Sequence, residues 1–366
     1  MVSKTSPPRT VLFITRKWPP AVGGMETYSA RLTGELARRV NLDLAALPGR
    51  ANGLPPTAWS ILGFAAGVAR DYLRRKEPPA IIHIGDMACW PFALLARFGN
   101  PRPAVLLSAH GTDVSYHRRG GWKGRLYGAY LRLGAWLNRN ATVIANSSAT
   151  ARVAAESGWL GVAVVPLATD LAGSASVPPH GRHLLFAGRL IEQKGCLWFV
   201  RNVLPLLPPE IRLKVAGPIW AKAEAAILDD PRVDYLGSLD KDALVAEYRN
   251  ALCVIVPNIE PASGEFEGFG LVAVEASAVG GVVLASATGG LVEAVIDGET
   301  GFLVPPGDPP AWRDKIAKVA AWDETRRSEY LTAAIARSRQ AYSWGRVADD
   351  VVKIYDGALA AEGQVR

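Results

Sequence analysis

The sequence predicts an α/β protein built from two doubly wound domains in tandem. Short apolar runs alternate with helical patterns along the chain, a strand–glycine–helix unit occurs twice, and a polar stretch rich in proline and glycine interrupts the alternation once, at residues 172–182. Repeated β–α alternation is typical of a parallel sheet covered by helices on both faces. The chain has 366 residues, more than the roughly 250–300 at which a single hydrophobic core stops growing, so two domains are expected.

The first strand–glycine–helix unit lies near the start of the chain. An apolar run at residues 10–15 is followed by Gly23-Gly24 and then by a helical pattern over residues 25–40, whose apolar positions recur every four residues on one face. Further strands are expected at residues 42–47, 80–84, 104–108 and 142–145, with helices over residues 58–76, 90–98 and 122–139. The first domain is predicted to span residues 1–173.

The second unit follows the polar stretch, where we place the interdomain linker. A strand at residues 183–187 leads to Gly188-Arg189 and a helix over about residues 195–207. Strands are then expected at 212–216, 233–236, 253–257 and 282–285, with helices over 221–228, 242–250 and 270–279. The second domain is predicted to span residues 182–340, and the last segment, 341–366, reads as a helix.

Composition excludes several classes of protein. Charged residues make up 20% and hydrophobic ones 49%, which fits neither a disordered nor a fibrous chain. The longest uncharged apolar run, residues 58–69, has 12 residues, short of the ~20 that cross a bilayer, and no signal-peptide pattern opens the sequence. The three cysteines lie far apart without CxxC spacing, so neither a disulfide framework nor a zinc site is expected. A cytoplasmic location is therefore expected.

Charge is distributed unevenly. Up to Gly173 there are 21 basic and 9 acidic residues, and beyond it 20 basic and 25 acidic. Residues 118–139 contain six basic residues, four Trp or Tyr residues and no acid, which predicts a surface for anionic lipid headgroups or a lipid-linked acceptor. The alternative is a helix with one core face and one solvated basic face. A nucleic-acid partner is not expected, because no nucleic-acid-binding motif occurs and the second half is acidic.

A glycine-rich segment with two carboxylates is the most informative part of the sequence. Glu267 lies in a loop after a strand, and Glu275 lies eight positions later, in the helix that follows. A helix N-terminus presents unpaired N–H groups and a partial positive charge that bind phosphate, while a carboxylate accepts sugar hydroxyl protons. The pattern indicates a nucleotide or nucleotide-sugar site, with two merely solvated glutamates as the alternative.

Other polar residues follow the ends of predicted strands. Arg189 and Lys194, five apart, are suited to neutralising a diphosphate, although a simple basic loop has the same pattern. His110 follows the strand at 104–108 and is a candidate for the same site or a hydrogen-bonded loop histidine. Asp240-Lys241-Asp242 matches a metal-binding D-x-D pattern, but it precedes a helix and is interpreted as a cap. No metal is expected, because the two cations can carry the diphosphate charge.

Eight motifs in order resemble those of the retaining, nucleotide-sugar-dependent glycosyltransferases of family 4, which have the GT-B fold. They are P-P-A-V-G-G-M-E at 19–26, H-G-T-D at 110–113, A-N-S at 145–147, G-R-L-I-E-Q-K-G at 188–195, A-G-P at 216–218, E-G-F-G-L-V-A-V-E-A at 267–276, the run at 289–304, and Y-S-W at 342–344. The resemblance implies two Rossmann-like domains facing each other across a cleft, with the C-terminal helix crossing back to the first domain.

The resemblance also implies roles for individual residues. Arg189 and Lys194 resemble the pair that binds the donor diphosphate and stabilises the leaving nucleotide. Glu275 resembles the glutamate that holds the ribose hydroxyls, Glu267 the one near the donor sugar, and His110 the histidine that faces this sugar. Donor-binding positions are expected at Gly23, Gly24, Gly268, Phe269, Gly270 and Leu271.

The expected reaction is the transfer, with retention, of a hexosyl unit from a UDP- or GDP-linked sugar to a lipid-linked or saccharide acceptor. The expected setting is bacterial cell-surface polysaccharide or glycolipid assembly, at the inner face of the cytoplasmic membrane, without a cofactor. The alternatives are another activity on the same fold, such as an epimerase, and a non-catalytic scaffold. A nicotinamide dehydrogenase is excluded, since no G-x-G-x-x-G follows the first strand. Glu260 and Glu265 leave open which acid of the loop is the active one.

Overall fold

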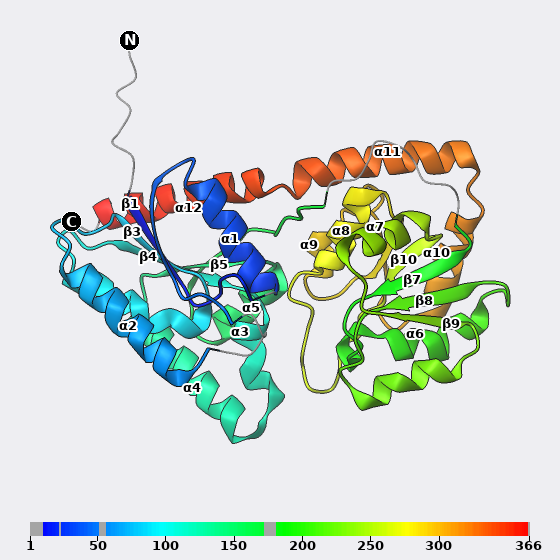
Figure 1. Ribbon diagram of the computed structural model, residues 1–366, viewed down its shortest axis with the longest axis horizontal. Helices are drawn as coiled ribbons and strands as arrows, with labels where there is room; N and C mark the ends of the chain where they lie inside the picture. The colour runs from blue at the N-terminus through cyan, green and yellow to red at the C-terminus, as the bar shows by residue number, and fades with distance from the viewer. Residues whose placement is uncertain (1–9, 22, 51–55, 172–180, 365–366) are drawn as a thin grey trace, which may run out of the picture. The chain divides into compact units, whose positions relative to one another are not determined.

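The computed structural model describes residues 10–21, 23–50, 56–171 and 181–364. The chain forms two compact units (Figure 1). Unit 1 comprises residues up to Val165 together with Trp344–Arg366, and unit 2 comprises Pro166–Ser343. The predicted linker at residues 172–182 lies, apart from its last two residues, outside the described residues.

Unit 1 is built around a six-stranded sheet, counted over the described residues, in which every neighbouring pair is parallel. Its order is β2-β1-β3-β4-β5-β6. The strands are β1 (Thr10–Thr15), β2 (Asn41–Ala46), β3 (Ile81–Ile84), β4 (Ala104–Ala109), β5 (Thr142–Ala145) and β6 (Gly161–Val164). The central strands β3 and β4 are apolar along almost their whole length because helices cover both faces of a parallel sheet.

All but the last of the helices of unit 1 lie between these strands in the sequence. The helices are α1 (Gly24–Leu36), α2 (Ala58–Leu73), η1 (Met87–Phe98), α3 (Thr112–Ser115), η2 (Tyr116–Arg119), α4 (Gly121–Leu137), α5 (Ser148–Glu156) and α12 (Trp344–Gln364). The η elements are 3-10 helices. The helix predicted at 90–98 is therefore longer and of 3-10 geometry, with Pro91 inside it, a residue that cannot donate the hydrogen bond of a regular α-helix.

The last helix completes unit 1. Figure 1 shows α12 beside α1, although unit 2 separates them in the sequence. Val347, Val351 and Tyr355 of α12 are fully buried. Inside the core, Tyr355 Oη lies 2.7 Å from His83 Nδ1, and His83 Nε2 lies 2.8 Å from Ser108 Oγ. Unit 1 thus takes part of its core from the end of the chain.

Unit 2 has a second six-stranded parallel sheet within the described residues, in the order β12-β11-β10-β7-β8-β9. The strands are β7 (His183–Ala187), β8 (Arg212–Ala216), β9 (Val233–Gly237), β10 (Cys253–Val256), β11 (Val283–Ser286) and β12 (Phe302–Val304). The helices are η3 (Glu192–Lys194), α6 (Cys196–Asn202), η4 (Leu204–Leu206), η5 (Lys222–Asp229), α7 (Lys241–Asn250), α8 (Leu271–Val279), α9 (Leu291–Ala294), α10 (Pro309–Ala320) and α11 (Glu324–Ala341).

Some predicted boundaries in unit 2 were wrong. The helix predicted over 195–207 divides at Val203, because Pro205 follows and interrupts the α-helical pattern. The helix predicted over 221–228 is the 3-10 helix η5. Residues 166–171, predicted to close the first domain, belong to unit 2, where the Thr169 N–H donates to the Tyr342 carbonyl oxygen at 3.2 Å.

The cap predicted at Asp240 is confirmed, and the structure also shows the state of the three cysteines. Cys89, Cys196 and Cys253 are free and buried. Asp240 caps α7, with its carboxylate accepting from the Ala243 N–H at 2.8 Å. Among the described helices, none is both long and apolar enough to cross a membrane.

Candidate active site

The order of strands fixes where a site is expected in each unit. In unit 2 the chain runs from β7 to β8 and β9 on one side of the sheet, and then returns to β10 on the other side of β7. Open α/β sheets bind ligands at such a reversal, outside the carboxyl ends of the two strands. The segments after β7 and β10 contain Arg189, Lys194 and Asn258.

Lys194 and Glu267 form an ion pair at this reversal. Lys194 Nζ contacts Glu267 Oε2, and Asn258 Nδ2 donates to the same oxygen at 3.0 Å. Only 15% of the Lys194 side chain and 13% of the Glu267 side chain are exposed. Asn258 is buried, and its Oδ1 has no hydrogen-bond partner among the described residues. The loop after β7 and two parts of the loop between β10 and α8 thus meet at a single carboxylate.

The surroundings of Glu267 favour its ionised form. Burial acts to raise the pKa of Glu267, but the Lys194 ammonium, the Asn258 amide and the Phe269 backbone N–H outweigh burial and hold this pKa below its ordinary value. Glu267 is therefore a carboxylate at neutral pH. Of the acids in this loop, Glu260 instead accepts from Thr288 Oγ1 at 2.5 Å, so Glu267 is the acid beside Lys194.

Glycines allow these loops to approach one another. A Cβ on Gly195 would lie 2.0 Å from the Pro257 carbonyl oxygen, and Gly195 has a φ of 70°. A Cβ on Gly290 would lie 2.3 Å from the Gly268 carbonyl oxygen, and the Gly290 N–H donates to the Glu267 carbonyl oxygen at 2.8 Å. Only glycine permits both approaches, so the backbone holds Lys194 and Glu267 in place.

Helix α8 begins beside this ion pair and carries Glu275. Gly270 precedes the helix with a φ of 100°, and no side chain caps its first turn. Glu275 lies in the second turn, where Tyr248 Oη donates to Glu275 Oε2 at 3.5 Å. Burial raises the pKa of Glu275, and the bond from Tyr248 acts in the opposite direction. The helix therefore offers N–H groups at its start and a carboxyl group one turn further along.

Arg189 contacts a tryptophan. Its guanidinium carbon lies 4.6 Å from the centre of the Trp220 ring, and both side chains are exposed. Such stacking leaves the edge of the guanidinium available to an oxyanion. A Cβ on Gly217 would lie 1.9 Å from the Gly188 carbonyl oxygen, so glycine at 217 lets the segments after β7 and β8 lie side by side.

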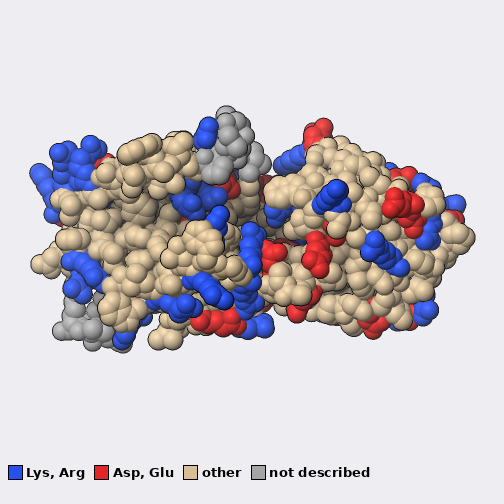
Figure 2. All heavy atoms as spheres, turned by 90° about the horizontal axis from the view of Figure 1, so that it is seen from below, with Lys and Arg blue, Asp and Glu red and all other residues tan. Residues whose placement is uncertain are grey.

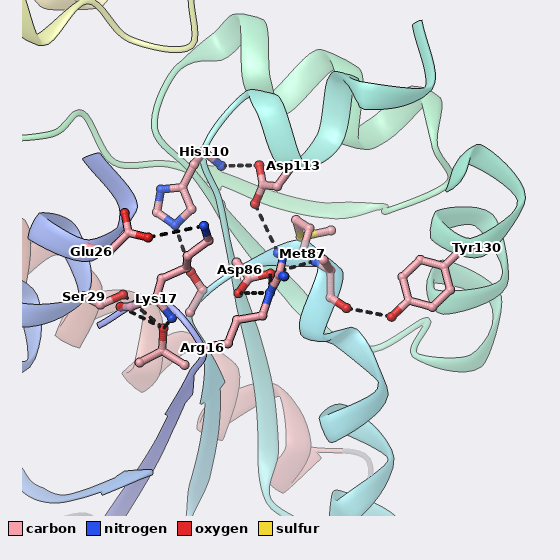
Figure 3. A network of polar contacts seen from close by, with 12 residues as sticks. Arg16, Lys17, Glu26, Ser29, Asp86, Met87, His110, Asp113 and Tyr130 are labelled. Carbon is pink, nitrogen blue, oxygen red and sulfur yellow. Dashed lines mark hydrogen bonds and ion pairs between the residues drawn. The ribbon is translucent and has the colours of Figure 1, made fainter. Parts of the chain in front are cut away.

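Unit 1 has its own strand-order reversal, between β1 and β3. Arg16, just after β1, directs its guanidinium at Asp86, after β3, with Nε at 3.3 Å from both carboxylate oxygens (Figure 3). Asp86 is fully buried, and its Oδ1 also accepts from the Ala88 N–H at 3.1 Å. Burial acts to lower the pKa of Arg16, but the adjacent carboxylate outweighs it and the pKa is raised. This pair joins the two loops across the reversal.

His110 follows β4 at the same edge of the sheet. Its backbone N–H donates to Asp113 Oδ1 at 2.8 Å, and the Met87 N–H donates to Asp113 Oδ2 at 3.1 Å (Figure 3). His110 Nε2 lies 2.9 Å from the Gly85 carbonyl oxygen. Because a carbonyl oxygen only accepts, Nε2 carries the proton, and Nδ1 of the neutral ring is an acceptor. The half-buried ring therefore has a fixed orientation and one acceptor nitrogen to offer.

Gly23 and Gly24 begin α1 near the same edge. Gly23 precedes the helix, Gly24 is its first residue, and no side chain caps the first turn. Glu26, in this turn, lies 3.3 Å from Lys17 Nζ, which follows β1 (Figure 3). The Lys17–Glu26 ion pair thus lies beside the glycine turn, and the sequence did not predict it.

Comparisons with known proteins identify the family. The family model described as "Glycosyltransferase Family 4" matches residues 22–172, and the model described as "Glycosyl transferases group 1" matches residues 181–321. The two matches follow one another and together span most of the chain, with one in each half. The chain belongs to glycosyltransferase family 4.

Curated relatives of this family 4 glycosyltransferase include D-inositol 3-phosphate glycosyltransferases. The protein of Corynebacterium efficiens is 35% identical over 199 residues, which are 51% of this chain and 45% of the relative. The protein of Saccharomonospora viridis is 42% identical over 201 residues, 50% of this chain and 45% of the relative. The match thus spans a little under half the length of these relatives.

Solved structures share the GT-B fold of this family 4 glycosyltransferase. Anabaena Alr3699/HepE, in complex with UDP and glucose, has a TM-score of 0.68 at 19% identity and covers 95% of this chain and 100% of its own. The sucrose-phosphate synthase of Thermosynechococcus elongatus has a TM-score of 0.72 at 20% identity and covers 96% of this chain and 100% of its own. The predicted fold class is confirmed.

The structure brings some of the predicted residues together and separates others. Lys194, Glu267 and the start of α8 lie together, whereas Arg189 contacts Trp220. Phe269 is buried and its ring lies 6.3 Å from that of Tyr342, so only its backbone faces the loop. Sequence reasoning missed Asn258, Asp86 and Arg16, although each follows the end of a central strand, and this position is the signal that identifies them.

Proposed function

We propose that this family 4 glycosyltransferase transfers a hexosyl unit, with retention, from a UDP- or GDP-linked sugar to a lipid-linked or saccharide acceptor. The observation that carries the proposal is the cluster at the strand reversal of unit 2. There, Lys194, Glu267 and Asn258 lie beside the uncapped start of α8, and Arg189 follows β7. Two cations and free backbone N–H groups suit a diphosphate, and Glu275 suits a ribose.

The proposed chemistry breaks the bond between the sugar C1 and the diphosphate oxygen, so the bonding electron pair and negative charge pass to the diphosphate. Arg189, Lys194 and the α8 N-terminus stabilise this charge, which is the largest contribution that a preorganised site makes to such a reaction. The acceptor oxygen bonds to C1 on the face that the diphosphate leaves, and its proton passes to the departing phosphate. Glu267 is not assigned as a nucleophile, because Lys194 and Asn258 hold its carboxylate.

A further polar group is proposed to recognise the donor sugar. Asn258 Oδ1, which has no hydrogen-bond partner among the described residues, accepts a hydroxyl of the donor sugar in this proposal. Because Arg189 and Lys194 carry the diphosphate charge, the transfer is proposed to need no metal. Activity that persists in EDTA supports this part of the proposal, and activity restored only by Mg²⁺ or Mn²⁺ contradicts it.

Helix α4 supports a proposed association with the inner face of the cytoplasmic membrane. Trp122, Leu126, Leu133 and Trp136 are 70%, 63%, 48% and 60% exposed. At ~100° per residue these four side chains lie within about 40° of one line along the helix. Gly124, Gly128, Leu131 and Ala135 form the opposite, buried face.

Basic residues flank the exposed apolar line of α4. Lys123, Arg125 and Arg132 are exposed on either side of it. Figure 2 shows that Lys and Arg side chains outnumber acidic ones over the unit on the left of the view, which is unit 1. An apolar line between cations is typical of helices that lie in a membrane interface. The core-plus-basic-face alternative does not account for two exposed tryptophans on one line.

The first experiment measures thermal stabilisation by UDP, GDP and their hexose conjugates. At a hundredfold excess over its dissociation constant, a ligand specific for the native state stabilises it by about 2.7 kcal/mol. We expect one nucleotide series to raise the melting temperature and Arg189→Ala and Glu275→Gln to abolish the rise, while Arg313→Ala, an exposed arginine of α10, preserves it. A rise that survives in both site variants contradicts the donor site.

The nucleotide sugar that stabilises the protein is then incubated with the protein and a set of candidate acceptors. Short saccharides, polyprenyl-phosphate sugars and inositol phosphate are compared, the last because the curated relatives are named D-inositol 3-phosphate glycosyltransferases. The anomeric configuration of the product is read by NMR. A product of inverted configuration contradicts the retaining mechanism, and transfer to inositol phosphate alone contradicts the proposed acceptor class.

A further inference from the structure

A pocket of about 250 Å³ lies in unit 1 at the amino ends of β4 and β5. Three segments form it: the end of η1, the residues that lead into β4, and the residues after α4. We call it the arginine pocket, after Arg97, Arg102 and Arg139, which come one from each segment and line it. None of the described residues that line it is acidic.

The arginine pocket is separate from the candidate active site. His110 and Arg16 follow the carboxyl ends of their strands, whereas Arg102 and Pro103 precede β4 and Ala141 precedes β5. At about 3.3 Å per residue, the six residues of β4 place these two edges of the sheet roughly 20 Å apart. The pocket is therefore not part of the site proposed for sugar transfer.

The carbonyl groups at the C-terminus of α4 do not repel an anion from this pocket, because two of them accept hydrogen bonds from side chains. Helix C-termini carry partial negative charge on their last carbonyl groups. Here Arg97 Nη2 donates to the Leu137 carbonyl oxygen at 2.9 Å, and Asn138 Nδ2 donates to the Gly134 carbonyl oxygen at 2.9 Å. These bonds occupy two of the terminal carbonyls and hold the Arg97 guanidinium beside the pocket, where its other N–H groups remain available.

Apart from Asn138 and Asn140, the remaining lining is apolar. Ala93, Ala96 and Ala141 are buried, and Trp136 also lines the pocket while 60% exposed. A pocket for a whole drug-sized ligand measures about 300–1,000 Å³, so this one suits a small group. Arginine recognises phosphate with paired N–H groups. Cations around an apolar floor suit a phosphate ester that carries an apolar group, rather than a free inorganic ion.

We propose that the arginine pocket binds the phosphate headgroup of an anionic membrane lipid. Trp136 belongs both to the pocket and to the exposed apolar line of α4, so a lipid bound here lies where that line ends. The proposal deepens the membrane association proposed above by naming the lipid group recognised. It does not depend on which sugar the enzyme transfers.

The test compares two triple variants of the full chain in vesicle co-sedimentation. One is Arg97→Gln with Arg102→Gln and Arg139→Gln, and its matched control is Lys123→Gln with Arg125→Gln and Arg132→Gln, which removes three charges from the exposed sides of α4. Vesicles of phosphatidylcholine are compared with vesicles that also contain phosphatidylglycerol. We expect the pocket variant to lose at least tenfold more affinity for phosphatidylglycerol vesicles than the control variant loses. Equal losses in the two variants overturn the pocket and leave only general electrostatic attraction.

Two further measurements separate the remaining explanations. Arg102→Gln alone, at an exposed position, is expected to lose affinity at least threefold while its melting temperature is unchanged. Glycerol phosphate in solution tests the source of the phosphate: if it binds the pocket as tightly as the vesicles do, a soluble phosphate ester replaces the lipid. Donor-induced stabilisation is measured on the same variants, so a failure of the donor site is seen independently of vesicle binding.

Discussion

At the residue scale, the pairing of Lys194 with Glu267 is the feature that most affects the proposed chemistry. Both side chains are largely withdrawn from water, and each therefore depends on the other for charge compensation. An incoming diphosphate brings more negative charge to Lys194, which then interacts with two anions. Under the proposed function, Glu267 would compete with the donor for Lys194, while its contact with Lys194 also holds that side chain in position.

Glu267→Gln tests which of these effects dominates. We expect the variant to bind the nucleoside diphosphate three- to tenfold more tightly, because a competing negative charge is removed, and to transfer sugar at least a hundredfold more slowly. Isothermal titration gives the affinity and initial rates give the transfer. Glu265→Gln, two residues earlier in the loop, serves as the control. Weaker nucleotide binding by Glu267→Gln contradicts the competition and indicates that positioning of Lys194 dominates.

His83 makes stability depend on pH. Burial lowers its pKa from 6.5 to about 3, so between these values the unfolded chain binds a proton that the folded chain does not. The folded state therefore loses stability as pH falls through this range, by ~1.36 kcal/mol per pH unit, or about 2 kcal/mol between pH 6.5 and pH 5.

Denaturant unfolding at several pH values measures this effect. His83→Gln is expected to be less stable than the wild type at pH 7, since its bonds to Tyr355 and Ser108 are disturbed, and to lose about 2 kcal/mol less on acidification to pH 5. Tyr355→Phe, which keeps the imidazole, is the control and should retain the wild-type slope. Parallel slopes for the wild type and His83→Gln contradict the prediction.

At the scale of elements, the sequence predicted the long apolar strands and the position of the motif loops well. It missed β6 and β12, which have four and three residues and lie at the sheet edges, where a short run carries little apolar pattern. It did not predict the 3-10 geometry of η1 and η5. The partners of Glu267 and Asp113 could not be predicted from the sequence. These contacts join loops that are distant in the sequence, and they form only when the sheet brings the ends of the strands together.

The close approach of loops at glycine residues predicts how substitutions there change the stability of the protein. Gly290 has an ordinary φ of −79°, but a Cβ there would lie 2.3 Å from the Gly268 carbonyl oxygen. We expect Gly290→Ala to destabilise the protein by about 1–3 kcal/mol through overpacking and to weaken donor binding by displacing the Glu267 loop.

Gly63→Ala provides the matched comparison. Gly63 lies within α2, and a Cβ there would meet no atom of the described residues within 4 Å. This substitution is expected to stabilise the protein by about 0.5–1 kcal/mol, because alanine loses less conformational freedom in a helix. Thermal unfolding and nucleotide titration of both variants check the pair, and equal stability of the two variants contradicts the crowding argument.

At the scale of the whole molecule, unit 2 is inserted between two parts of unit 1. Helix α12 supplies Val347, Val351 and Tyr355 to the core of unit 1, which the preceding 165 residues do not complete. A chain shortened after Ser343 is therefore expected to lose the unfolding transition of unit 1 in calorimetry while keeping that of unit 2. A chain ending at Ala361, an exposed position, serves as the control. Two unchanged transitions in the shorter chain contradict the assignment.

The return of α12 also sets an order of events during synthesis. A ribosome that builds the chain from its first residue completes all of unit 2 before it adds Tyr355, so unit 2 can reach its final form while unit 1 still lacks a helix. Until then His83 has no Tyr355 hydroxyl beside Nδ1, and the core that supports His110 is open. The part of unit 1 that is translated first therefore matures only after unit 2 has been made, and the site at its sheet edge forms only once α12 has been translated.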